Sequence, residues 1–286
     1  MTSTEHAIAF QVNGETLYGI VHAPQKASTT KGILIVVGGP QTRVGSHRQF
    51  VLLARFLADE GIPAMRFDYR GMGDSQGDAR NFEAIGPDIR AALDAFQNDL
   101  DDLKEITLWG LCDAASAAAF YGPTDPRVVS LILLNPWVRS EDGLAKAYLK
   151  HYYVSRLLNP GLWRKIFKGK FNLVESLRSL FQNLITALGL AKPSPPLEQS
   201  PETTAPLADR MFEKLKLFNG KILLILSGND LTAAEFKDLE KHSRQWHALL
   251  KQRRITQYEL PFATHTFSRR EWRDQVAIWT RDWLKS

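Results

Sequence analysis

The sequence predicts an α/β protein built on a doubly wound, mostly parallel sheet. Short apolar runs alternate with amphipathic stretches along most of the 286 residues, a pattern typical of βαβ units with right-handed crossovers. Runs such as 32–37 and 128–135 are almost continuously apolar, as expected of parallel strands that are buried on both faces. Ligands of such sheets bind beyond the carboxyl ends of the strands, so the residues that follow each strand are the first candidates for function.

The expected elements follow one another in chain order. Residues 7–12 and 16–22 flank the turn sequence Asn-Gly-Glu and are expected to form an N-terminal antiparallel hairpin. Further strands are expected at 32–37, 63–69, 105–110, 128–135, 221–228 and 254–261. Helices are expected around 50–57, 85–96, 113–120, 232–252 and 272–283, where apolar residues recur at helical spacing or small residues gather.

The alternation of strands and helices stops between residues 139 and 218. Residues 174–188 have a helical apolar seam, and 192–206 form a Pro-rich stretch with little helix or strand propensity. We therefore expect an α/β core made of 1–138 and 219–286, interrupted by a helical cap or lid at 139–218.

Charge and composition limit the partners and compartments that fit. The chain has a net charge of +5, but residues 143–192 have nine basic side chains and a single acid, Glu175. A solvated helix face would explain this local basicity; the alternative is a weak contact with an anionic membrane or a phosphate-bearing carrier. The local pattern argues against a nucleic-acid partner.

The single cysteine, Cys112, cannot form an internal disulfide. The sequence has no HExxH spacing and too few thiols for a Cys-rich zinc site, so neither a metal nor a cofactor is expected. It also has no apolar run of the ~20 residues that a membrane span needs, and the first residues lack the features of a signal peptide. These observations make a cytoplasmic location the expectation.

The strongest chemical signal is the sequence Gly110-Leu111-Cys112-Asp113-Ala114, which lies between an expected strand and an expected helix. A nucleophile elbow needs this context, because a sharp turn holds the reactive atom above the sheet while small neighbours allow close backbone approach. The helix N-terminus would also favour a thiolate over a thiol. The alternative is that Cys112 is a small buried apolar residue, as unpaired cysteines often are.

An acid and a histidine follow in an order that favours catalysis. Asp230 comes after the strand at 221–228, and His265 comes after the strand at 254–261. The order nucleophile, acid, histidine is that of α/β-hydrolase triads, in which the histidine is the general base and the acid orients it. A surface-loop histidine would be the ordinary alternative for His265 considered alone.

An oxyanion hole would need two backbone donors. The amide of Asp113 is the first candidate. The second should come from the loop Gly38-Gly39-Pro40-Gln41. Because Pro40 has no N–H, this donor is expected to be Gly39 or Gln41.

Other residues have weaker claims on the chemistry. His47, Trp137 and His151 are candidates for substrate contact. Residues 73–77 spell Gly-Asp-Ser-Gln-Gly, but this GxSxG match lies several residues beyond its strand and leads into a polar loop. Its glycines fit turn positions, so Ser75 is not expected to be a nucleophile. Ser116, one helical turn past Cys112, is expected to be a packing or helper residue.

These motifs resemble those of the α/β-hydrolase superfamily over nearly the whole chain. The combination GGPQTRVGSHRQF, RFDYRGMGDS, GLCDAASAA and NPWVR resembles the exosortase A system-associated hydrolases of bacteria. That resemblance implies a role linked to exopolysaccharide or envelope biosynthesis. A Cys-His-Asp triad on Cys112, His265 and Asp230 is also similar to that of dienelactone hydrolases. The departure is Ala114, where the common elbow has glycine.

The sequence leaves three functions open. The first is an acyl hydrolase, an esterase or thioesterase, that forms an acyl-enzyme on Cys112. The second is an acyltransferase that passes the acyl group to a sugar hydroxyl, which the sequence does not separate from the first. The third is a non-catalytic binding module, because a fold alone does not establish activity. Membrane-surface association through the basic segment would be an addition to catalysis, and the acyl chain, leaving group and oligomeric state are left open.

Overall fold

The computed structural model of the protein describes residues 3–25, 30–39, 41–138 and 205–286. The described chain forms one compact unit, to which residues 205–286 return after the segment 139–204. The predicted cap at 139–218 therefore lies outside the described residues, apart from its last fourteen positions. None of the helices in the described ranges is long and apolar enough to cross a membrane.

The core is an eight-stranded sheet with the order β1-β2-β4-β3-β5-β6-β7-β8. The first two strands and β4 pair in antiparallel fashion, and the remaining neighbours are parallel. The strands are β1 (Ser3–Val12), β2 (Glu15–Pro24), β3 (Lys31–Val36), β4 (Ala64–Phe67), β5 (Glu105–Leu111), β6 (Val128–Leu134), β7 (Lys221–Ser227) and β8 (Ile255–Leu260). The predicted fold class is confirmed.

The N-terminal hairpin is also confirmed. Asn13 and Gly14 connect β1 to β2 with φ angles of 52° and 86°, and Val12 pairs with Glu15. Two central residues with positive φ define the tight turn whose twist matches that of the flanking strands. Glycine adopts this conformation without a steric cost, and asparagine tolerates it better than most residues do.

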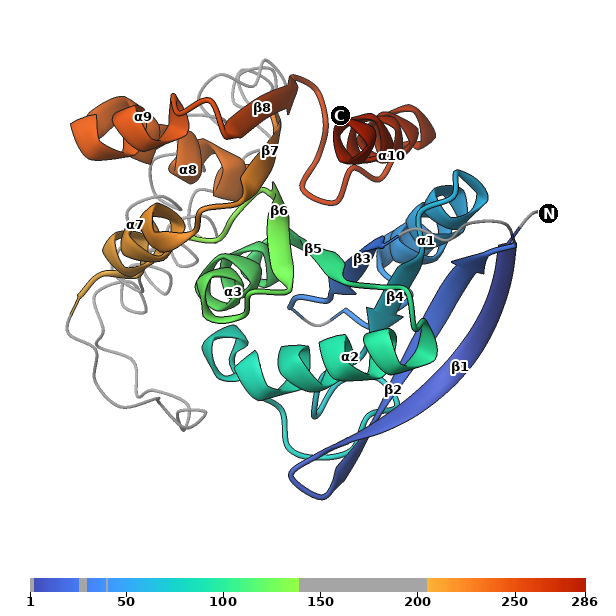
Figure 1. The fold of residues 1–286 in the computed structure, drawn as a ribbon. Helices are drawn as coiled ribbons and strands as arrows, with labels where there is room; N and C mark the ends of the chain where they lie inside the picture. The colour runs from blue at the N-terminus through green and yellow to red at the C-terminus, as the bar shows by residue number, and fades with distance from the viewer. Residues whose placement is uncertain (1–2, 26–29, 40, 139–204) are drawn as a thin grey trace, which may run out of the picture. The chain divides into compact units, whose positions relative to one another are not determined.

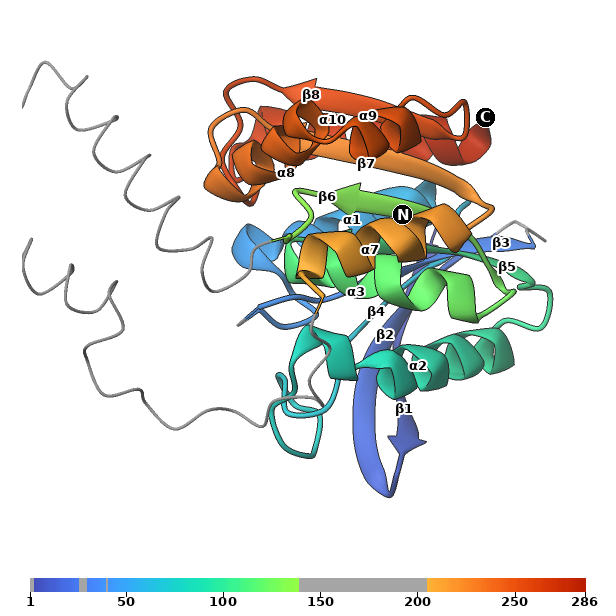
Figure 2. The ribbon, with the colours of Figure 1, turned by 90° about the vertical axis from the view of Figure 1, so that its left-hand side faces the viewer.

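Seven α-helices cover the sheet within the described ranges. They are α1 (Gln49–Asp59), α2 (Gly86–Asp99), α3 (Asp113–Tyr121), α7 (Leu207–Leu217), α8 (Leu231–His242), α9 (Arg244–Leu250) and α10 (Arg270–Lys285). Helices α1 and α10 lie together on one face, and the other helices lie on the opposite face (Figures 1 and 2). Covering both faces explains why β3 is apolar along its length, because Ile33–Val36 are fully buried.

The structure differs from the sequence prediction at two helices. The single helix expected at 232–252 is two helices, because Ser243 adopts an extended conformation and its hydroxyl caps α9 by accepting the Trp246 N–H at 3.4 Å. The second difference is α7, which falls within the range 139–218 that the sequence predicts to be the cap. Its buried Leu207, Met211 and Leu215 pack in the core unit, so the described unit resumes at residue 205 and not at 219.

The parallel strands bring their carboxyl ends to one edge of the sheet. The loops after β3, β5, β6, β7 and β8 therefore meet there, as doubly wound sheets require. Backbone hydrogen bonds tie these loops to one another: Cys112 N–H donates to Leu134 O at 2.9 Å, and Asn135 N–H donates to Ile225 O at 3.1 Å. This edge contains the three residues that the sequence singled out for catalysis.

Candidate active site

Cys112 lies at a sharp turn between β5 and α3. Its φ and ψ are 63° and −124°, a combination that non-glycine residues rarely adopt and that costs of order 1–3 kcal/mol. The turn is fixed by its carbonyl oxygen, which accepts the N–H groups of Ala115 at 3.1 Å and Trp137 at 3.2 Å. The side chain is half-buried, so the thiol is held in place and still accessible.

Two glycines make room for this turn. A methyl group on Gly110 would come within 2.5 Å of the carbonyl atoms of Ala114, and a methyl group on Gly38 would lie 2.8 Å from the Ala114 N. Both contacts are with the backbone, which cannot give way without moving the start of α3. The methyl group of Ala114, the departure from the common elbow, would lie 3.0 Å from a Cβ on residue 38, so it fits because that residue is glycine.

Asp230 and His265 meet beside the turn. Asp230 caps α8 by accepting the Ala233 N–H at 3.0 Å, and the same oxygen lies 3.0 Å from His265 Nδ1. The carboxylate is almost fully buried, whereas the imidazole is 34% exposed. Since Nδ1 faces the acid, Nε2 is the nitrogen available to Cys112, which is close enough to be one of the groups that raise the pKa of His265.

These contacts change the ionisation of the pair. The hydrogen bond to Asp230, followed by the hydrogen bond to Cys112, raises the pKa of His265 to about 10 although burial opposes the charge. Burial acts most strongly and would raise the pKa of Asp230, but the hydrogen bond and charge of His265, together with the backbone N–H groups of Ala233 and Thr232, outweigh it and leave that pKa below its usual value. An imidazolium beside a carboxylate is therefore the favoured state at neutral pH.

Asn135 positions the histidine loop, a role that we did not predict. Its side chain is fully buried and bridges two loops: Nδ2 donates to His265 O at 3.0 Å, and Oδ1 accepts the Ser227 N–H at 2.9 Å. Its φ of 43° is also unusual. The available signal was a polar residue directly after β6, at the start of the NPWVR motif.

The carboxylate of Asp113 occupies the region where we expected the oxyanion hole. It accepts the Gly39 N–H at 2.8 Å and the Ala114 N–H at 3.0 Å. Burial raises the pKa of Asp113, against these backbone hydrogen bonds. The Gln41 N–H donates to Gly38 O at 3.3 Å, so both amides considered for the second donor already have acceptors.

The remaining candidates for substrate contact are spread more widely. Trp137 is next to the site because its N–H donates to Cys112 O. His47 is exposed in the short 3-10 helix Ser46–Arg48 before α1, with φ 53°. His151 lies outside the described residues.

The two serines that we set aside have structural partners. The Ser75 hydroxyl is buried, donates to Asp68 O at 2.7 Å and accepts the Tyr18 N–H at 3.0 Å. Its side chain thereby ties the loop after β4 to β2. The Ser116 hydroxyl donates to Trp137 O at 2.6 Å and thus supports the loop that contacts Cys112.

Comparison with solved structures shows the same fold in several hydrolases. An esterase of Pyrococcus furiosus is 13% identical and matches with a TM-score of 0.66, covering 99% of this chain and 91% of its own. Est1E from Butyrivibrio proteoclasticus, solved with ferulic acid, is 14% identical with a TM-score of 0.63 and 97% of each chain covered. A dienelactone hydrolase from Anabaena variabilis is 15% identical with a TM-score of 0.61, covering 100% of this chain and 98% of its own.

Sequence comparison adds two matches. A curated polyketide transferase, grgF of Penicillium sp, is 30% identical over 92 residues, and this match spans only 31% of either protein. The model of the family described as serine aminopeptidase, S33, matches residues 28–174, slightly more than half of the chain. The matched range begins before β3 and includes the Cys112 turn. The chain therefore belongs to the serine aminopeptidase S33 family and is an α/β-hydrolase.

Proposed function

We propose that the protein hydrolyses esters or thioesters through an acyl-enzyme on Cys112. The single observation that supports this most strongly is the meeting of Asp230, His265 and Cys112 at the carboxyl edge of the sheet: His265 Nδ1 lies 3.0 Å from Asp230 Oδ2, and Cys112 is among the groups that raise the pKa of His265. A nucleophile, a base and an orienting acid within hydrogen-bond reach are the parts that covalent acyl transfer needs. The esterases of the same fold are consistent with this substrate class.

Acylation begins with the transfer of the Cys112 proton to His265. The pKa of His265 is raised to about 10, so the imidazole can hold this proton at neutral pH. The sulfur attacks the acyl carbonyl and forms a tetrahedral oxyanion. Collapse of this intermediate breaks the bond to the leaving alkoxide or thiolate, which takes the proton from His265 and departs as an alcohol or thiol.

Deacylation uses the same histidine in the opposite role. Once the sulfur is a neutral thioester, Cys112 no longer contributes to raising the pKa of His265, and only Asp230 still does so. The neutral imidazole takes a proton from water, and the resulting hydroxide attacks the thioester carbonyl. The acid leaves as the bond to the sulfur breaks, and the proton on His265 returns to the sulfur, so charges and protons balance over the cycle.

The oxyanion needs backbone donors, and we assign the amides of Asp113 and Gly39. The Asp113 carboxylate accepts the Gly39 N–H, so it must turn away before an acyl oxygen can take its place. Asp113 therefore slows catalysis in this proposal. An oxyanion hole whose amides have no competing acceptor would not have this cost.

The biological setting that we propose follows from the motif resemblance described above. An exosortase-linked hydrolase would act in the cytoplasm of a bacterium, on an acyl group attached to a saccharide or to its phosphate-bearing carrier. The basic segment 143–192 would suit such an anionic carrier. Neither a metal nor a cofactor has a part in this chemistry.

A panel of nitrophenyl esters and acyl thioesters tests the proposal. We expect turnover by the wild-type protein and a loss of at least 10³-fold in kcat for Cys112→Ala, by analogy with the effect of removing triad members. Ser75→Ala is the matched control and should retain activity. Unchanged turnover by a folded Cys112→Ala variant would refute the cysteine mechanism.

A second candidate is transfer of the acyl group to an acceptor other than water. The observation that favours it is the partial match to a polyketide transferase across 31% of the chain. The same acyl-enzyme serves both reactions, and they differ only in what attacks it. Product analysis with and without an added alcohol distinguishes them, because a transferase yields a new ester in proportion to the alcohol whereas a hydrolase yields free acid.

A further inference from the structure

A buried ion pair fastens the loop after β3 to the loop after β4. Arg43 follows Gly39 by four residues, and Asp68 comes directly after β4. The Arg43 N–H donates to Asp68 Oδ1 at 2.5 Å, and the guanidinium donates to Asp68 Oδ2. The Asp68 side chain is fully buried, whereas that of Arg43 is 19% exposed. Because a buried carboxylate without its partner is costly, this pair holds the two loops together.

The residues of the GxSxG match are built around Asp68. A methyl group on Gly73 would lie 2.2 Å from Asp68 Oδ2, so glycine is needed to leave room for the carboxylate. Asp74 Oδ2 accepts a second N–H of the Arg43 guanidinium at 2.5 Å. The Ser75 hydroxyl donates to Asp68 O at 2.7 Å. The match therefore has a structural role: it keeps Asp68 in contact with Arg43.

Arg66 on β4 binds the other backbone group of Arg43. Its Nη1 donates to Arg43 O at 3.1 Å, and its Nε lies 3.0 Å from His22 Nε2. Both Arg66 and His22 are buried. The N–H, the carbonyl oxygen and the guanidinium of Arg43 are thus all bound by β4 or by the loop that follows it.

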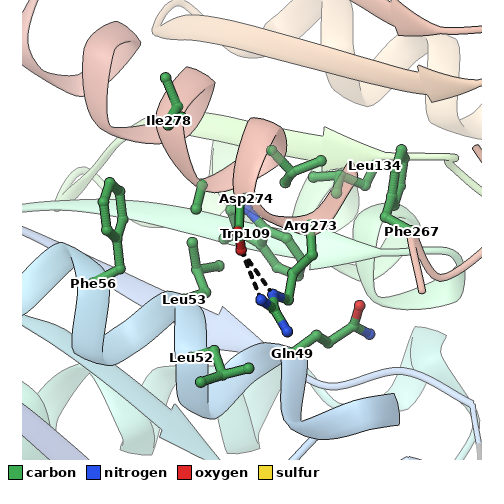
Figure 3. A pocket seen from close by; sticks show the side chains of 12 residues that line it. Gln49, Leu52, Leu53, Phe56, Trp109, Leu134, Phe267, Arg273, Asp274 and Ile278 are labelled. Atoms are coloured by element: carbon green, nitrogen blue, oxygen red, sulfur yellow. Dashed lines mark hydrogen bonds and ion pairs between the residues drawn. The ribbon is translucent and has the colours of Figure 1, made fainter. Parts of the chain in front are cut away.

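Gln41 connects this anchored part of the loop to Gly39. Its N–H donates to Gly38 O at 3.3 Å, which closes a turn that contains Gly39. Its side-chain oxygen accepts Gln49 Nε2 at 3.4 Å. Gln49 lies at the start of α1, on the wall of the cavity shown in Figure 3. A displacement of Arg43 would therefore be passed on to the Gly39 amide.

We propose that Asp68 and Arg43 are positioning residues that hold the Gly39 amide where the acyl oxyanion forms. This role rests on the proposed function, because it takes Gly39 as the second oxyanion donor. Both side chains would act through the loop and not on the substrate. Oxyanion donors are effective only when they are directed at the developing charge, and removal of one costs about 10²–10³ in kcat.

The test compares Asp68→Asn and Arg43→Lys with the wild type in two reactions. The first is turnover of a nitrophenyl ester, and the second is alkylation of Cys112 by iodoacetamide, which displaces iodide and forms no oxyanion. Asparagine keeps the shape without the charge, and lysine cannot bridge two carboxylates as arginine does. We expect kcat per folded molecule to fall roughly tenfold or more in both variants, with KM and the alkylation rate unchanged.

The matched control is the pair Asp125 and Arg127, which lies before β6 and thus at the opposite edge of the sheet. Asp125 is buried and accepts the Arg127 N–H at 3.1 Å and Nη2 at 2.7 Å. Arg127 Nη1 also donates to the exposed Asp94 at 2.6 Å, so the two ion-pair networks have the same design. Asp125→Asn and Arg127→Lys should lose stability as their counterparts do but keep the wild-type kcat per folded molecule.

Three results would overturn the positioning role: a wild-type kcat in the variants of Asp68 and Arg43, equal losses of kcat in Asp68→Asn and Asp125→Asn, or an alkylation rate that falls as far as kcat. Arg43→Lys decides the question if Asp68→Asn does not fold. Turnover that is lost in Cys112→Ala but kept in Asp68→Asn would refute the positioning role alone. Absence of turnover in the wild type would refute the proposed function with it.

Discussion

Replacing Asp113 by alanine should accelerate the enzyme, an unusual expectation for a buried acid beside a nucleophile. The Asp113 carboxylate accepts the Gly39 N–H at 2.8 Å, which is one of the two amides that we assign to the oxyanion. Gly38 allows this approach, because a methyl group there would lie 2.2 Å from the other carboxylate oxygen. The substrate oxyanion must displace this carboxylate, and the free energy needed to do so is part of the barrier.

The size of the effect follows from the hydrogen bond that is lost. A hydrogen bond to a charged group contributes about 1.5–3 kcal/mol net, so removing the carboxylate should raise kcat/KM by about 10- to 150-fold. Asp113→Asn keeps the shape but accepts the N–H without a charge. Since a neutral hydrogen bond contributes about 0.5–1.5 kcal/mol, its gain should be smaller than that of alanine.

The assay is kcat/KM on a nitrophenyl ester, measured beside the melting temperature of each variant. Asp113→Ala also removes the hydrogen bond made by the Gly39 N–H from the free enzyme, so the variant should lose about 1.5–3 kcal/mol of stability. A modest fall in melting temperature is therefore expected together with the gain in rate. If kcat/KM stays constant or falls in the folded Asp113→Ala variant, the Gly39 amide is not the second donor and the Asp113 carboxylate does not slow catalysis.

The other predictions concern the turn, the triad and its support. Gly110→Ala should cost about 1–3 kcal/mol of stability and roughly 100-fold in kcat, because its methyl group would meet the Ala114 carbonyl at 2.5 Å. Chemical denaturation measures the loss of stability. The control Gly86→Ala should have nearly the stability of the wild type, since the closest contact of its methyl group is 3.8 Å. The folded-state pKa of His265 is raised to about 10 from an unfolded value near 6.5, so the stabilisation is complete below pH 6.5 and is lost as pH rises through 10. The difference in unfolding free energy between wild type and Asp230→Asn should shrink over that window, and a constant difference would contradict the assignment. Asn135→Ala should lose about 1–3 kcal/mol by leaving Ser227 N–H unpaired. It should also lower kcat per folded molecule with little change in KM. A kcat equal to that of the wild type, once corrected for the folded fraction, would mean that Asn135 acts only in folding.

Periodicity was sufficient to predict the sheet and most of its helices. Strands buried on both faces are continuously apolar, and helices such as α1 show their buried side at helical spacing, so each element has a local signal. The boundary between α8 and α9 at Ser243 has only a weak local signal in the sequence, because a serine is tolerated inside a helix as well as at its start. The assignment of α7 to the core depends on its packing, which no local pattern encodes.

The approach of the three candidate catalytic residues was predictable from chain order and strand ends. Cys112, Asp230 and His265 each follow a strand, and parallel strands end at one edge, so their approach follows from topology. The roles of Asn135 and the Asp113 carboxylate depend on side-chain directions over a few ångströms. The same is true of Ser75, whose GxSxG match could be set aside from sequence but whose hydrogen bonds to Asp68 and Tyr18 could not be foreseen.

The central claim, covalent chemistry at the Cys112 sulfur, is tested most directly by stopping the reaction with a nitrophenyl ester in acid and weighing the intact protein and its peptides. The account predicts a single added acyl group on the peptide that contains Cys112, formed within the first turnover. It also predicts a longer lifetime of that adduct in His265→Ala once formed, because no base remains to activate water. Turnover without an adduct, or an adduct on Ser75 or Ser116, would contradict it.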